Sequence, residues 1–289
     1  DIHYAMDSMV ADLPKTHATL QLPNPKPSKP KVNWVRIDLT TDKLDFAMAT
    51  PLKAALKASD IQLEAGNVLS KDPVLYAAVG LQTERPVEVA MDSMGGTVNA
   101  PKLKLYAEYN SKDTVGLTKA EAALACASLD GFYTDTKAKL GKAQLEASMT
   151  AGKRLSAKLK TDALKAQMGE ELKAQTANLA IEASARYNKN GANALLKWNP
   201  RLKVQLADGV AQMPERLPEP VRVPSIDFSY SNREMAINNA RVEMVNSDLN
   251  LKGNVRNIGK WFRHEGILEG ELDVVSDHCD ANQLMAWFS

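Results

Sequence analysis

The sequence predicts a mainly β fold, an elongated antiparallel sheet with one apolar face and few short helices. Apolar and polar residues alternate with a period of two through the middle of the chain, which is the pattern of half-buried strands. Short segments that contain glycine or asparagine separate the alternating runs, as hairpin turns do. Hydrophobic residues make up 44% of the 289 residues, which is enough apolar material for a folded core.

Two proline-rich stretches divide the chain. The first, Leu22–Pro30, closes a lead segment at residues 1–30, and the second lies at residues 213–224. Prolines this dense lack amide donors and favour extended conformations, so both stretches are interpreted as linkers. The predicted organisation is therefore a linker-terminated lead segment at 1–30, a long antiparallel body at 31–212, the second linker, and a C-terminal β segment at 225–289.

The body supplies the strands. Its alternating apolar sets include Val35, Ile37 and Leu39; Leu103, Leu105 and Ala107; Leu145, Ala147 and Met149; Leu155, Ala157 and Leu159; Leu179, Ile181 and Ala183; and Leu202, Val204 and Leu206. Turns are predicted at Ala65-Gly66-Asn67, Met94-Gly95-Gly96, Asp130-Gly131, Ala151-Gly152-Lys153 and Asn188–Gly191. Strong helix formers dominate residues 118–185, but the alternation persists through them, so strands are favoured and short helices around 117–127 stay an alternative.

Composition and motifs argue against catalysis and against nucleic-acid binding. The formal net charge is +1, and no nucleophile elbow, phosphate loop or metalloprotease spacing occurs. His278-Cys279-Asp280 resembles a ligand cluster, but adjacent residues on a strand point to opposite faces, so it is interpreted as structural. We predict no enzyme activity, no metal and no cofactor. For Cys126 and Cys279 we favour two buried free thiols, with a disulfide as the alternative.

No apolar run approaches the roughly 20 residues of a membrane span. The chain begins with Asp1, so we expect a fragment or processed product whose anchor lies elsewhere. The basic residues Lys137, Lys139, Lys142, Lys153, Arg154, Lys158 and Lys160 are expected on a solvated face, with contact to anionic lipid head groups as the alternative. Trp261-Phe262 and Trp287-Phe288, the largest apolar residues of the tail, are expected in a core or at one end of a groove.

The tail carries the most specific pattern. Ser247-Asp248-Leu249 precedes Gly253 and Asn257; then come Gly270, Leu272 and Ser276, and finally Asp280, Asn282 and Leu284-Met285. This order resembles the C-terminal region of the AsmA family, within the wider AsmA/TamB group of bacterial envelope proteins. His278-Cys279 departs from the apolar residue usual before that aspartate. The resemblance covers about the last 65 residues of the chain and identifies no active site.

The resemblance implies a membrane-anchored periplasmic protein whose β-rich body carries phospholipid along a hydrophobic groove, in support of outer-membrane biogenesis or lipid homeostasis. A curled sheet with one apolar face would make such a groove. The candidate lining residues are Leu145, Ala147, Met149, Leu155, Ala157, Leu159, Leu179, Ile181 and Ala183. The alternative is a structural or protein-interaction domain of the envelope, in which the apolar face packs as a closed β core.

Overall fold

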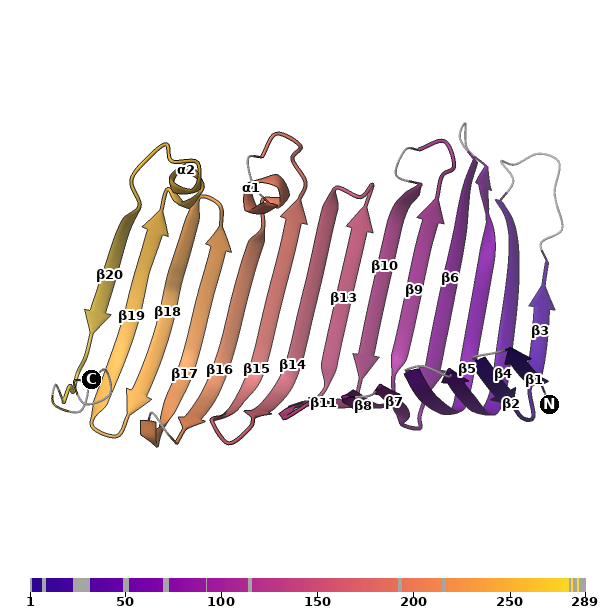
Figure 1. Cartoon of the computed structure of the whole chain (residues 1–289), viewed down its shortest axis with the longest axis horizontal. Coiled ribbons are helices and arrows are strands. Elements are labelled where there is room, and N and C mark those ends of the chain that lie inside the picture. Colours follow the sequence, from indigo (N-terminus) through magenta and orange to yellow (C-terminus); the bar gives the residue numbers. More distant parts are fainter. Residues whose placement is uncertain are drawn as a thin grey trace. The chain divides into compact units, whose positions relative to one another are not determined.

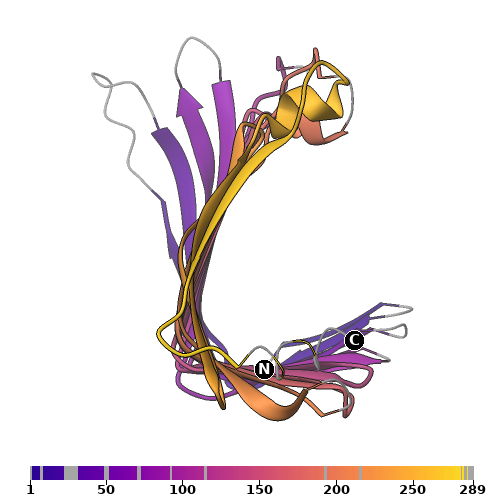
Figure 2. The ribbon, with the colours of Figure 1, turned by 90° about the vertical axis from the view of Figure 1, so that its left-hand side faces the viewer.

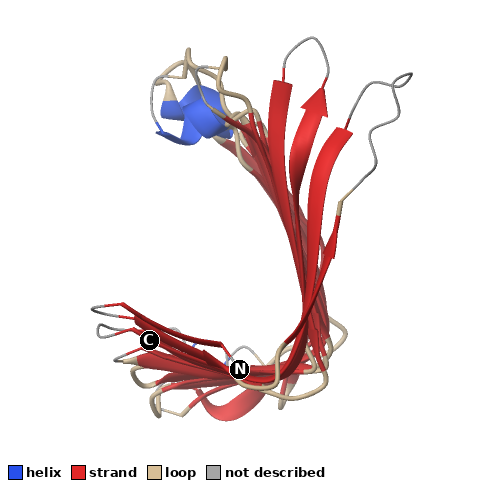
Figure 3. Cartoon of the chain, turned by 90° about the vertical axis from the view of Figure 1, so that its right-hand side faces the viewer, coloured by secondary structure: helices blue, strands red, loops and turns tan. Residues whose placement is uncertain are grey.

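The computed structural model describes residues 2–6, 9–22, 32–48, 52–69, 73–91, 93–113, 116–191, 194–214, 217–280, 282 and 285. These residues form a large antiparallel sheet of many strands with two short helices (Figures 1 and 3). The prediction of a mainly β, antiparallel fold with few helices is confirmed. The curled groove stays a prediction.

The chain divides into two compact units. Unit 1 comprises Asp1–Thr134 and Lys142–Leu155, and unit 2 comprises Asp135–Gly141 and Ser156–Ser289. The strands of unit 1 are β1 (Ile2–Met6), β2 (Met9–Leu13), β3 (His17–Gln21), β4 (Val32–Met48), β5 (Leu52–Leu69), β6 (Pro73–Thr83), β7 (Val87–Met91), β8 (Met94–Asn99), β9 (Lys102–Tyr109), β10 (Leu117–Cys126), β11 (Ser128–Tyr133) and β13 (Ala143–Thr150). The predicted limits 1–30, 31–212, 213–224 and 225–289 stay a prediction.

Each long strand of unit 1 pairs with two shorter strands. The first part of β4 pairs with β3 and its last part with β2. The first part of β5 pairs with β7, and the rest with β6. The pairing then continues as two rows, one through β6, β9, β10 and β13 and the other through β7, β8 and β11. In this sheet β4 and β5 are continuous, whereas the strands on either side of them are interrupted and form two sets of shorter strands.

Unit 2 contains β12 (Thr136–Leu140), most of β14 (Arg154–Met168), β15 (Leu172–Arg186), β16 (Arg201–Met213), β17 (Leu217–Ser231), β18 (Glu234–Met244), β19 (Ser247–Arg256) and β20 (Glu269–Val275). Strands β15 to β20 pair in chain order as an antiparallel meander. Helix α1 (Ala194–Trp198) connects β15 to β16, and α2 (Ile258–Phe262) connects β19 to β20. Both helices lie at the same end of these strands (Figure 1).

Burial in unit 1 concentrates where the strands break. The buried residues Thr41, Thr83, Pro101, Cys126 and Ala143 lie on neighbouring strands or directly beside them, and we call this set the break line of unit 1. Ala143 is only 1% exposed and lies opposite Cys126. The Thr83 hydroxyl accepts a hydrogen bond from the Arg85 amide at 3.1 Å, which provides a partner for a backbone donor just beyond the end of β6.

Unit 2 has a corresponding break line, formed by the buried residues Thr161, Leu179, Gly209 and Ala240. Here the strands continue through the line, but one extra residue interrupts the register. Asn178 on β15 and Asp208 on β16 both have a φ of 54°, and the pairing of these two strands shifts beside them. Such bulges bend a strand and increase its twist. The strands of unit 2 accordingly bend along their length (Figure 2).

Three predicted turns are wrong. Ala65-Gly66-Asn67, Met94-Gly95-Gly96 and Asp130-Gly131 lie inside β5, β8 and β11. The reason at Gly96 is close backbone approach: a Cβ there would come within 2.6 Å of the Asp130 carbonyl oxygen on the paired strand. The turns at Ala151-Gly152-Lys153 and around Asn188–Gly191 are confirmed.

Two further expectations concern helices and prolines. The alternative of short helices around 117–127 is wrong, because Leu117–Cys126 is strand β10. Residues 217–224, which belong to the second proline-rich stretch, begin strand β17. Pro218 and Pro220 precede the part of β17 that pairs with β18, and Pro224 sits at a register shift, so the missing amides fall where the ladder does not use them. Residues 23–30 of the first stretch lie outside the described residues.

The cysteines are free, as favoured, but only Cys126 is buried and Cys279 is exposed. Burial raises the pKa of the Cys126 thiol, which reduces its thiolate fraction near neutral pH. We expect a maleimide or disulfide reagent to label one thiol rapidly and the second only on unfolding. Mass spectrometry of partially labelled protein should assign the fast site to Cys279. Equal rates at the two thiols would contradict the burial of Cys126.

Candidate functional site

An apolar face runs across strands β4, β5, β6, β9, β10 and β13 of unit 1. Directly paired residues share a face of a sheet, so the register defines continuous rows. One row is Ile37, Leu63, Val79, Leu105, Ala122 and Ala147; the next is Val35, Ala65, Ala77, Ala107, Ala120 and Met149; and a third begins at Leu81 and continues through Leu103, Leu124 and Leu145. The face consists of apolar side chains over at least five strands, and many of them are alanine.

The opposite face of unit 1 is polar. Tyr76 donates a hydrogen bond to Glu64 at 3.0 Å and stacks on Tyr106 with ring centroids 6.1 Å apart. Lys119 lies 5.1 Å from the centre of the Tyr106 ring. Burial, together with the hydrogen bond to Glu108, raises the pKa of Tyr106 to about 12. These interactions keep the aromatic rings on the polar face in contact with charged groups.

Unit 2 has the same two-faced construction. Its apolar rows are Ala183, Leu202, Tyr230, Met235, Val255 and Gly270; Ile181, Val204, Phe228, Ile237, Gly253 and Leu272; and Leu206, Ile226, Ala240, Leu251 and Val274. On the other face, Asp227 accepts hydrogen bonds from Asn238 at 2.9 Å and from Gln205 at 2.7 Å. These two donors lower the pKa of the Asp227 carboxyl.

Little covers the apolar faces. Among the described residues, the buried hydrophobic side chains are Cys126, Ala143, Leu179, Leu196, Ala240 and Ile258, and no large side chain is fully buried. Leu105 is 40% exposed and Leu272 is 60% exposed. The chain exposes 18906 Å². Two compact globules of half its mass would together expose about 14,600 Å². The apolar rows therefore form wide, partly exposed surfaces.

The predicted groove residues fall in both units. Leu145, Ala147 and Met149 belong to the apolar face of unit 1, and Ile181 and Ala183 to that of unit 2. Leu179 is 7% exposed and lies on the break line, whereas Leu155 is 39% exposed. Ala157 is exposed and Leu159 half-buried on β14. Whether these residues line a groove stays a prediction.

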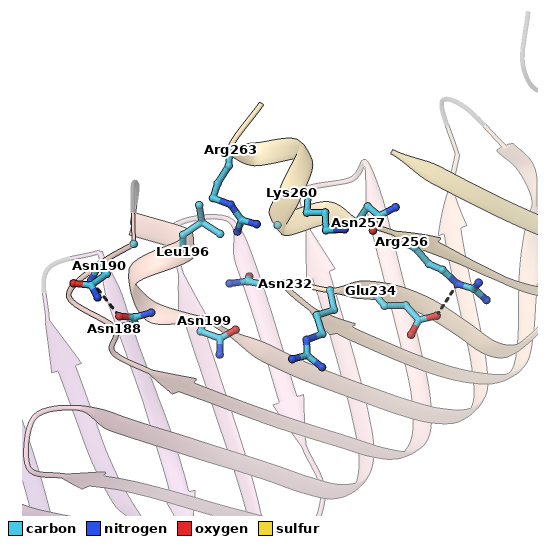
Figure 4. A pocket seen from close by; sticks show the side chains of 13 residues that line it. Asn188, Asn190, Leu196, Asn199, Asn232, Glu234, Arg256, Asn257, Lys260 and Arg263 are labelled. Atoms are coloured by element: carbon cyan, nitrogen blue, oxygen red, sulfur yellow. Dashed lines mark hydrogen bonds and ion pairs between the residues drawn. The ribbon is translucent and has the colours of Figure 1, made fainter. Parts of the chain in front are cut away.

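A pocket of about 660 Å³ opens in unit 2 between α1 and α2, beyond the ends of the apolar rows (Figure 4). Leu196 on α1 is 8% exposed and Ile258 on α2 is 7% exposed, so each helix has one buried apolar anchor. The pocket is lined by Asn188, Asn190, Gly191, Leu196, Asn199, Asn232, Arg233, Glu234, Arg256, Asn257, Gly259, Lys260 and Arg263. Its lining includes five asparagines, four cationic residues and one carboxylate.

Sequence reasoning did not find this pocket. Its residues come from α1 and the connections on either side of it, from the β17–β18 turn with the first residue of β18, and from the end of β19 and the segment around α2. The available signal was the concentration of Asn and Arg in these connections. Trp261 and Phe262, expected in a core or as a groove plug, lie on α2 and are 48% and 38% exposed, so the expectation of a core is wrong.

Hydrogen bonds link the pattern residues Ser247 and Asp248 to the segment that follows the last strand. The Ser247 hydroxyl accepts a hydrogen bond from the Asp280 amide at 2.9 Å, and the Asp248 carboxylate accepts one from the His278 amide at 2.8 Å. A Cβ on Gly253 would come within 2.4 Å of the Glu271 carbonyl oxygen, so the pairing of β19 with β20 leaves no room for a side chain there. His278 and Cys279 are exposed and follow the last strand, so they lie in a loop rather than on a strand.

The described residues contain no group of three or more His, Cys, Asp and Glu side chains arranged to hold a metal. Among the helices of the described chain, none has the length and apolar character needed to cross a membrane. No family model, curated protein or solved structure matches the chain.

Proposed function

We propose that this chain is a non-catalytic module of the bacterial cell envelope that binds or conducts phospholipid along a hydrophobic β groove. The observation that carries the proposal is the combination of continuous apolar rows with their partial exposure, since among the described residues no large side chain is fully buried. Exposed apolar faces of this extent mark sites that receive a hydrophobic partner. Acyl chains suit such a face, because removing each CH₂ from water contributes about 0.8 kcal/mol.

The break lines support a trough that opens on the apolar side. Cys126 lies two residues beyond Leu124, and Thr161 two residues beyond Leu159, so both point to the apolar side of their strands. Thr161 is buried whereas the next residue, Asp162, is exposed, and on β13 Ala143 is buried whereas the next residue, Gln144, is exposed. When a strand bends, side chains inside the bend lose exposure and those outside gain it. The asymmetry favours sheets that bend toward their apolar faces.

The composition of the faces favours a fluid ligand over a single protein partner. Alanine, valine and leucine dominate the rows, and the aromatic residues in them are few. Protein interfaces are enriched in large aromatic anchors and arginine, which these rows largely lack. A low, even apolar surface has no pocket that would fix one side chain of a protein partner. Such a surface permits acyl chains to slide along it.

The likeness of the tail to the AsmA family supports the location of the proposed activity. It is the ground on which we propose a periplasmic, membrane-anchored protein with a role in outer-membrane biogenesis or lipid homeostasis. The contacts among Ser247, Asp248, His278 and Asp280 support a structural role for that part of the pattern.

The test is direct extraction of lipid from protein purified out of a bacterial periplasm. We expect phospholipid in near-stoichiometric amount by mass spectrometry, and exchange of a phospholipid with a fluorescent acyl chain into the purified protein. Protein that carries no lipid and accepts no fluorescent lipid would overturn the proposal. That result would favour the alternative of an envelope interaction domain whose apolar face is closed by packing.

A further inference from the structure

We propose that the pocket between α1 and α2 binds a phosphate group, and that in the proposed lipid-binding function this group is the phosphodiester of a phospholipid head group. The lipid source rests on the proposed function, whereas binding of phosphate does not. The pocket lies outside the apolar rows and belongs wholly to unit 2.

The charges of the pocket favour an anion. Four cationic side chains line it against one carboxylate, Glu234, which already pairs with Arg256 at 3.7 Å. Arg263 pairs with Glu265 at 2.6 Å. In the part of the chain that the structure describes, the side chains of Arg233 and Lys260 form no ion pair. The pocket therefore keeps a positive excess that a ligand can neutralise.

The donor types suit a phosphate group. Guanidinium groups match the tetrahedral oxygens of phosphate through paired N–H donors. Asparagine side chains supply additional amide donors, and they also supply acceptors for hydroxyl groups next to a phosphate. A volume of about 660 Å³ exceeds the needs of a bare ion and accommodates a head group.

Backbone hydrogen bonds hold the walls of the pocket. Asn257 adopts a φ of 65°, and its amide donates to the Arg233 carbonyl at 3.0 Å. The Gly259 amide donates to the Asn232 carbonyl at 2.6 Å, which ties α2 to the β17–β18 turn. On the other wall, a Cβ on Gly191 would lie 2.3 Å from the Lys197 backbone nitrogen, so the loop packs closely on α1. The cations thus project from backbone segments that are already connected to one another.

The position of the pocket suits an amphipathic ligand. Met235 and Val255 are paired in the apolar row nearest the pocket. The pocket residue Arg233 precedes Met235 by two positions, and the pocket residue Asn257 follows Val255 by two. Two strand residues span roughly 7 Å. A phosphate in the pocket would therefore lie one residue pair away from acyl chains on the apolar face, as the two parts of a phospholipid require.

The experiment measures binding of soluble probes to the full chain by calorimetry in about 0.15 M salt, where long-range attraction is screened. The probes are inorganic phosphate, glycerol phosphate and a monomeric short-chain phosphatidylglycerol. The test variant replaces Arg233, Lys260 and Arg263 with glutamine. The matched control replaces Lys203, Arg222 and Lys252, which are exposed on β16, β17 and β19, with glutamine and therefore removes the same charge. Circular dichroism verifies that both variants are folded.

We expect the pocket variant to weaken binding of all three probes about tenfold or more, because charge-assisted hydrogen bonds are lost. The control variant should change binding less than about twofold. Equal weakening by the two variants, or no phosphate binding by the parent chain, would overturn the proposal.

The source of the phosphate follows from the same titrations. Tighter binding of the short-chain lipid than of glycerol phosphate identifies a lipid head group, and the difference should disappear in a Phe228→Asp variant on the apolar face. Equal binding identifies a soluble phosphate ligand. If the proposed lipid function fails but the pocket is real, glycerol phosphate still binds and the pocket variant still loses it.

Discussion

Replacing Phe228 with aspartate should abolish phospholipid retention, whereas replacing its neighbour Ser229 with aspartate should leave retention unchanged. Phe228 lies in the middle of an apolar row between Val204 and Ile237, and Ser229 points to the opposite face. A carboxylate under an acyl chain loses hydration without gaining a partner, which costs several kcal/mol. We expect at least a tenfold loss of bound lipid, measured by extraction and mass spectrometry.

A second pair tests the same idea in unit 1. Leu145 belongs to the apolar face, and Gln144 precedes it on the opposite, exposed side of β13. Leu145→Asp should reduce lipid retention and Gln144→Asp should not, although the two variants add the same charge. Urea unfolding of all four proteins separates lost binding from lost folding. If the Phe228→Asp and Ser229→Asp proteins are both folded and retain equal amounts of phospholipid, lipid does not bind on this face.

The alternation of residue types was sufficient to predict most strands of the body. Leu202, Val204 and Leu206 share a face because the side-chain period of a strand is two, whatever the neighbours are. The same argument favoured a strand at β10 despite its alanine-rich composition, and Leu117–Cys126 is a strand. Helix propensity contributes only tenths of a kcal/mol per residue, and the burial of one strand face exceeds it.

The sequence predicted the wrong role for Gly96 and no role for the threonines of the break lines, because these roles depend on the neighbouring strand. Gly96 was expected in a turn, but it permits close approach to Asp130 within the ladder. Thr83 and Thr161 mark the break lines, and each is followed by an acidic residue that interrupts the alternation. That interruption was visible in the sequence, but its alignment across strands is set by register, which a single sequence does not specify.

The pocket between the helices was beyond sequence reasoning for the same reason. Asn188 and Lys260 are 72 positions apart, and they line one pocket only because β15 to β19 pair in order and return both connections to one end of the sheet. The lipid-facing residues, by contrast, follow from local alternation. The sequence therefore predicts which residues share a strand face better than it predicts which connections meet at the end of the sheet.

Enlarging Ala143 and Ala147 to leucine should have opposite consequences for stability. Ala143 is 1% exposed at the break line and faces Cys126, so the larger side chain must displace its neighbours. Overpacking of this kind costs about 1–3 kcal/mol. Ala147 lies on the same strand and the same face but is exposed, so its substitution should change the free energy of unfolding by less than about 0.5 kcal/mol. Urea denaturation of the lipid-free proteins measures both values.

This pair also discriminates between the two functions proposed for the apolar face. In a closed β core, Ala147 would be packed against a second layer, and leucine there would destabilise the protein as it does at Ala143. In an open groove, leucine at Ala147 adds apolar area that only a ligand can cover. Ala147→Leu should then leave the stability of the lipid-free protein unchanged and raise its affinity for the fluorescent phospholipid. Destabilisation by both substitutions would instead favour the closed core.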